Sequence, residues 1–183
     1  MKLEAGLRGA RPVPHEVVID NSTDSEYHTQ RNNAHTPAVE CGISSAINAL
    51  LAANVIDVPW APPSLDDRFA AFMRRHEARE RMHQDSPRWA GEGYEPFMVH
   101  VVLAWGINEW VNRQGYNEWV HLPANTRPVT VDEYRGNWTW KQLLFAILKG
   151  RALVMSGTFT RFGHMVAVVG FHTWQTDVKD AEA

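Results

Sequence analysis

Apolar residues recur at helical spacing in the first half of the chain. The first stripe consists of Ile43, Ile47, Leu50 and Leu51. This spacing predicts an amphipathic helix over residues 39–53 with one face packed inward. Pro37 lies just upstream, which suits a loop that turns into a helix.

A second helix is predicted over residues 64–83. Ser64 is followed three residues later by Asp67, the pattern of a capping box at a helix start. Phe69, Phe72 and Met73 mark its buried side. The charged residues that follow are expected to face water: Arg74, Arg75, Glu77, Arg79, Glu80 and Arg81.

Two more helices follow. Pro96 can occupy the first turn of a largely buried helix over residues 96–113, after a loop over residues 85–95. Asn137 is a candidate cap for a helix over residues 138–149, which Gly150 would close.

The strongest strand signals come late in the chain. Residues 152–156 and 164–171 are apolar and flank a turn at 158–163, which predicts a β-hairpin. Shorter strands are predicted at 16–20, 118–122 and 128–131. Because the helices come first and the hairpin last, the layout indicates an α+β fold, not alternating βαβ units.

Composition narrows the class of protein. The 183 residues suit one domain, and a hydrophobic share of 44% with a charged share of 21% is ordinary for a soluble globular protein. A net charge of −3 gives no indication of a nucleic acid or membrane partner. No apolar run is long enough to span a bilayer, and residues 1–14 lack the apolar core of a secretory signal. We therefore expect synthesis in the cytoplasm, with the site of action left open.

The single cysteine, Cys41, lies where the first helix should begin. One cysteine excludes an internal disulfide and a cysteine-based zinc cage. The positive end of the helix dipole favours the thiolate form, which attacks carbonyl carbons. The carboxylate of Glu40 would oppose this effect. The alternative interpretation of Cys41 is a small core residue.

A cysteine nucleophile needs a base and donors for the developing oxyanion. His164 opens an apolar strand just after Gly163, where its side chain can point into a cleft. Gln30, upstream of Cys41, can supply a side-chain amide beside the backbone N–H of Cys41. The alternative for His164 is a strand-end residue that is hydrogen-bonded to a loop carbonyl. The alternative for Gln30 is a solvated loop glutamine.

Two blocks of sequence resemble a C39-like cysteine peptidase domain of the papain-like superfamily. The first runs Tyr27-His28-Thr29-Gln30-Arg31-Asn32-Asn33, then Pro37 and Cys41-Gly42-Ile43-Ser44-Ser45. The second runs Lys149-Gly150-Arg151-Ala152-Leu153-Val154, then Gly163-His164-Met165-Val166-Ala167-Val168-Val169-Gly170-Phe171. The resemblance covers residues 27–171.

The resemblance implies a papain-like fold in which a helical N-terminal part, with the nucleophile at a helix start, packs on a C-terminal antiparallel sheet. Cys41 would be the nucleophile, His164 the base and Gln30 part of the oxyanion hole. Residues 1–26 would form an N-terminal arm with a short strand, and residues 27–183 the peptidase domain.

The chain departs from the family pattern near its end, where a further strand normally delivers the residue that orients the histidine. Asp180 lies at about the family's spacing, and Asp177 is the other candidate. A frayed acidic tail is an equally good interpretation.

The hypothesis is a thiol protease or amidase that cleaves a peptide bond or a cell-wall peptide cross-link, without a cofactor. By family analogy, action at a bacterial cell wall or in a phage particle is a variant of it. The alternative is an inactive papain-like domain that serves as a binding or virion-assembly module. His76, Glu80 and His83 share a helix face that resembles a metal site, but the many arginines nearby favour a solvated face.

Overall fold

The computed structural model describes residues 15–18, 29–34, 38–53, 55–56, 64–111, 140–161 and 163–173. Its elements, in chain order, are β1 (His15–Val18), η2 (Gln30–Asn32), α1 (Cys41–Ala52), α2 (Leu65–Met73), α3 (His76–Asp85), α4 (Pro87–Gly91), η3 (Pro96–Met98), α5 (His100–Glu109), α6 (Trp140–Leu148), β2 (Leu153–Gly157), β3 (His164–Val168) and β4 (Gly170–Thr173).

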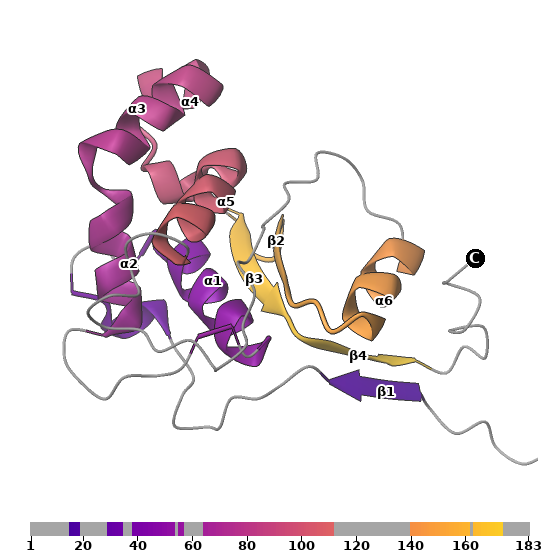
Figure 1. Ribbon diagram of the computed structural model, residues 1–183. Helices are drawn as coiled ribbons and strands as arrows, with labels where there is room; N and C mark the ends of the chain where they lie inside the picture. Colours follow the sequence, from indigo (N-terminus) through magenta and orange to yellow (C-terminus); the bar gives the residue numbers. More distant parts are fainter. Residues whose placement is uncertain are drawn as a thin grey trace, which may run out of the picture.

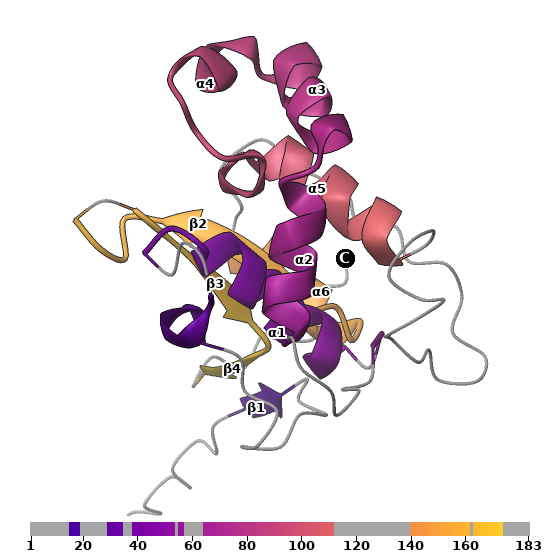
Figure 2. The ribbon, with the colours of Figure 1, turned by 90° about the vertical axis from the view of Figure 1, so that its left-hand side faces the viewer.

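Helix α1 is central in this arrangement. It packs against α2 on one side and against β2 and β3 on the other, whereas α6 contacts β1 and β4 (Figure 1). Helices α3 and α4 lie at the end farthest from β1 and β4 in both views (Figures 1 and 2). The α+β class is therefore confirmed.

The strands in the described part of the chain form two antiparallel pairs. In the predicted hairpin, β2 pairs with β3, with Leu153 opposite Val168 and Gly157 opposite His164. The predicted strand over residues 164–171 is divided into β3 and β4. Strand β4 turns to a different partner, β1, and His15 lies opposite Thr173.

The core confirms the apolar stripe of the first helix. Ile43 and Ile47 are fully buried, and Leu50 and Leu51 are nearly so. They join a cluster that includes Phe69 from α2 and residues of η3 and α5. The prediction of a single inward face is wrong, however, because α2 and the β2–β3 hairpin cover α1 from two sides and leave only Cys41 and Asn48 partly exposed.

The predicted helix over residues 64–83 is wrong as a single element. Its start is confirmed, since the Ser64 Oγ accepts a hydrogen bond from the Asp67 backbone N–H at 3.3 Å. The chain then breaks after Met73: Arg75 has extended backbone (φ −66°, ψ 161°) and precedes α3. The polar run at the break provides no apolar residue to hold a continuous helix, and Arg74 makes a tertiary contact described below.

The predicted helix over residues 96–113 is also two elements. Val99 has extended backbone (φ −107°, ψ 117°) and separates η3 from α5, which ends at Glu109. The predicted loop over residues 85–95 contains α4, which Pro87 opens. Gly150, at φ +73°, follows α6 as predicted.

Two predicted strands, at 118–122 and 128–131, lie outside the described residues, as does Asn137. Among the helices that the structure describes, none is long and apolar enough to cross a bilayer.

Candidate functional site

Cys41 is the first residue of α1, as predicted, and the residue is half-buried. It packs against the edge of the hydrophobic core rather than inside it. The residue is therefore not sealed in the core, which is compatible with a nucleophile.

His164 is the first residue of β3 and is also half-buried. The turn before it is closed twice: the Gly163 N–H donates to the Thr160 carbonyl at 3.1 Å, and the Thr160 Oγ1 donates to the Gly163 carbonyl at 2.6 Å. Gly163 has φ +79°, a backbone conformation that favours glycine. The turn thus fixes the point at which His164 enters the strand.

The segments that contain Cys41 and His164 pack together through Met165. The Ser45 Oγ donates a hydrogen bond to the Met165 carbonyl at 3.0 Å. A Cβ atom added to Gly42 would lie only 2.9 Å from the Met165 Sδ. Cys41 precedes Gly42 and His164 precedes Met165, so the start of α1 lies against the start of β3.

The absence of a side chain at Gly42 allows a second close approach. A Cβ atom there would lie 2.7 Å from the backbone carbonyl oxygen of Phe97 in η3. Since a carbonyl cannot move aside as a flexible side chain can, only glycine fits between η3 and β3. The first turn of α1 is thereby held on two sides.

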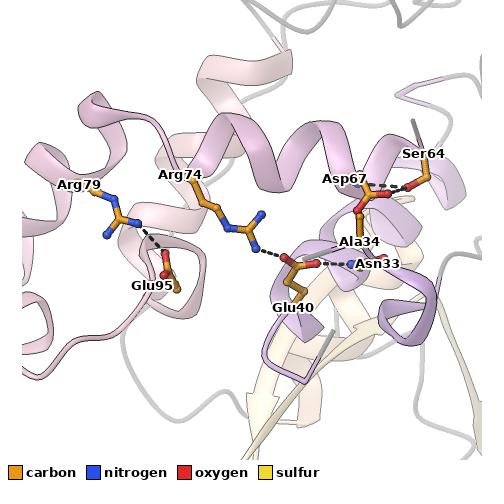
Figure 3. Close-up of polar contacts among 8 residues, drawn as sticks. All are labelled: Asn33, Ala34, Glu40, Ser64, Asp67, Arg74, Arg79 and Glu95. Atoms are coloured by element: carbon orange, nitrogen blue, oxygen red, sulfur yellow. Dashed lines mark hydrogen bonds and ion pairs between the residues drawn. The ribbon is translucent and has the colours of Figure 1, made fainter. Parts of the chain in front are cut away.

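Gln30 opens η2, is half-buried, and belongs to an element that contacts α1. The rest of its loop is tied to two helix starts. The Asn33 Nδ2 donates to the Glu40 Oε2 at 2.6 Å, and the Ala34 N–H donates to the Asp67 Oδ1 at 2.8 Å (Figure 3). These bonds hold the Gln30 loop near the beginning of both α1 and α2.

Glu40, directly before Cys41, is completely buried at 0% exposure. Its second carboxylate oxygen, Oε1, forms an ion pair with the Arg74 guanidinium (Figure 3). Arg74 also lies over the Phe97 ring, 5.4 Å from the ring centroid. The expectation that Arg74 faces water is therefore wrong: only 21% of its side chain is exposed.

A buried hydrogen bond joins α1 to α2 one turn further along. The Ser44 Oγ donates to the Asp66 Oδ2 at 3.1 Å, and both residues are buried. Such bonds satisfy polar groups that would otherwise destabilise the core.

Three residues that matter at this site were not predicted from the sequence: Asn33, Arg74 and Met165. Arg74 sits in an arginine-rich run, so no local signal sets it apart from its neighbours. Asp180 and Asp177 lie outside the described residues. That Asp180 or Asp177 orients His164 thus stays a prediction.

Within the described ranges, no group of three metal-ligating side chains comes together. The side chains of His76 and Glu80 are exposed and lie close together, with 3.4 Å between Nδ1 and Oε2. This contact is typical of neighbours one turn apart on a helix.

Comparison with known proteins finds no relative of this chain. No family model, no curated protein sequence and no solved structure matches the chain. The function must therefore be inferred from the residues and their arrangement.

Proposed function

We propose that the protein is a papain-like cysteine hydrolase that cleaves an amide bond. The main support is the packing of α1 on β3 through Met165, which brings together the helix start with Cys41 and the strand start with His164. The half-buried state of both side chains is compatible with a site at the edge of the core.

In the proposed reaction, His164 takes the proton of the Cys41 thiol and the sulfur attacks the carbonyl carbon of the substrate. The C–N bond then breaks, and His164 gives the proton to the departing amine. Water, deprotonated by the same imidazole, attacks the resulting thioester. The products are a carboxylic acid and the regenerated thiol.

Gln30 and the Cys41 backbone N–H are the proposed donors to the oxyanion. The ties from Asn33 and Ala34 support this role, because a donor must be held in place before charge develops. Asp180 is the proposed residue that orients His164, with Asp177 as its competitor. A C39-like domain is the family that these roles suggest.

The proposed substrate is a peptide, with a cell-wall peptide cross-link as the variant. We would incubate the protein with denatured casein and, separately, with peptidoglycan sacculi, and measure the amines released. Cys41→Ser and His164→Ala should each lower turnover by about three orders of magnitude or more. Wild-type turnover in Cys41→Ser would rule out the proposed nucleophile.

A binding module is the second candidate, favoured by an exposed aromatic pair. Trp89 and Tyr94 are 39% and 38% exposed, and their rings meet edge to face at 4.8 Å between centroids. Arg88 lies over the Trp89 ring at 5.5 Å. Adjacent exposed rings form a small apolar patch, and such patches are candidate contact surfaces for a partner. If the protein binds casein or sacculi but releases no amines from either, and if Cys41→Ser binds equally well, the result would favour this role.

A further inference from the structure

The buried carboxylate of Glu40 has partners from two other parts of the chain. Oε1 pairs with Arg74 at the end of α2, and Oε2 accepts from Asn33 in the loop that follows Gln30 (Figure 3). Glu40 thus connects α1, α2 and the Gln30 loop at the residue before Cys41.

A buried carboxylate beside a thiol works against thiolate formation, because two like charges repel in a medium of low dielectric constant. Water cannot screen the charge of Glu40, which has 0% exposure. Arg74 supplies the opposite charge. The guanidinium thus offsets the charge of the carboxylate that directly precedes Cys41 in the chain.

Other charged groups on the elements packed against α1 must be considered. They are His164 on β3, Asp66, Asp67 and Arg68 on α2, and Arg31 on η2. Asp66 accepts from Ser44, and Asp67 accepts from Ser64 and Ala34 at the opposite end of α2 from Arg74. Arg74 is therefore the cation joined directly to the carboxylate that precedes Cys41.

We infer that Arg74 is a positioning residue that neutralises Glu40 and thereby keeps the thiol of Cys41 reactive near neutral pH. This inference rests on the proposed function, since it assigns Arg74 to the same site. Arg74 touches no reacting atom in this account and acts through Glu40.

The test is the rate of alkylation of the full-length protein by iodoacetamide between pH 6 and pH 9.5. Because Cys41 is the single cysteine, total alkylation reports on this thiol alone. The variants are Arg74→Gln, Arg74→Lys, Glu40→Gln and the double variant Glu40→Gln/Arg74→Gln. Arg79→Gln is the matched control, because Arg79, whose side chain is 51% exposed, forms an ion pair with Glu95 at 3.2 Å (Figure 3).

Arg74→Gln should slow alkylation at pH 7 by about three-fold or more and move the rate–pH curve to higher pH. Arg74→Lys and the double variant should restore most of the wild-type rate, and Arg79→Gln should leave it unchanged. A merely structural role would change the alkylation rate at every pH without moving the rate–pH curve, because loss of a buried partner loosens the fold and does not act on the thiol charge.

An unshifted curve in folded Arg74→Gln, or a double variant as slow as Arg74→Gln, would overturn the inference. If Arg74→Gln does not fold, Glu40→Gln decides: its rate at pH 7 should equal or exceed the wild-type rate, and a slower rate overturns the inference. The comparison of Arg74 variants does not involve His164. Failure here is therefore distinct from failure of the proposed hydrolase, which would show as an unchanged rate in His164→Ala.

Discussion

The Ser45 Oγ donates a hydrogen bond to the backbone carbonyl of Met165 across 120 residues of sequence, at 3.0 Å. The bond is buried and ties the second turn of α1 to β3. Cys41 and His164 lie at the starts of these two elements. The proposed site therefore exists only when the helical part and the late hairpin have docked.

Ser45→Ala should weaken this docking. We expect the free energy of unfolding to fall by about 1 kcal/mol, since a buried carbonyl loses a donor. Urea denaturation measures the change. Ser156→Ala on β2, where the side chain is exposed, is the control and should change stability by less than about 0.5 kcal/mol. Equal losses in the two variants would contradict the importance of the Ser45 bond.

Gly42→Ala should destabilise the first turn of α1. Its Cβ would meet the Phe97 carbonyl at 2.7 Å and the Met165 Sδ at 2.9 Å. We expect a loss of about 1–3 kcal/mol, the usual cost of overpacking. Gly91→Ala in α4 is the matched control, because nothing lies within 4 Å of its added Cβ. A Gly42→Ala protein as stable as wild type would show that the contact is not tight.

Gly150→Ala tests a different property of glycine. No atom lies within 4 Å of a Cβ added there, but φ is +73°. The N–H groups of Gly150 and Arg151 donate to the carbonyls of Ile147 and Ala146 at 2.9 and 3.0 Å, which closes α6. We expect a loss of about 1 kcal/mol from backbone strain alone. Thermal unfolding of Gly150→Ala beside Gly91→Ala measures it, and identical midpoints would contradict the prediction.

Asp67→Ala should loosen the Gln30 loop without touching the thiol. It removes the acceptor for the Ala34 N–H, so we expect kcat to fall by about ten-fold, a fraction of the effect of losing an oxyanion donor. Alkylation of Cys41 should keep its wild-type rate. Ser64→Ala is the control, since it removes the helix cap and leaves the Ala34 contact in place. A kcat that falls equally in both variants would point to helix capping instead.

Local pattern predicted most of the elements that the structure describes. The spacing of Ile43 and Ile47 and the turn before His164 are local signals, and both gave the right element within a few residues. The break after Met73 was missed; at that break Arg74 pairs with Glu40, a partner 34 residues away that helical spacing does not reveal. The break at Val99 was also missed; beside it, the Phe97 carbonyl lies against Gly42, a contact that is distant in sequence.

The candidate site likewise contains residues that the sequence predicted and residues that only the structure revealed. Cys41 and His164 were singled out by residue type and by position at the start of an element, and Gln30 was singled out as an amide upstream of Cys41. Their supports, Asn33, Arg74 and Met165, carry no local signal, because each acts through a partner that is distant in sequence or through its backbone. Glu40 was noticed as an opposing charge, but its burial and pairing follow only from the folded chain.

The most direct measurement is the pH dependence of Cys41 alkylation by iodoacetamide in wild type and in His164→Ala. An imidazole paired with the thiolate keeps the sulfur reactive well below the range of an ordinary thiol, about pH 8.5. We predict substantial reactivity near pH 6 in wild type and its loss in His164→Ala. A wild-type curve that matches an ordinary thiol and does not change in His164→Ala would contradict the hydrolase account.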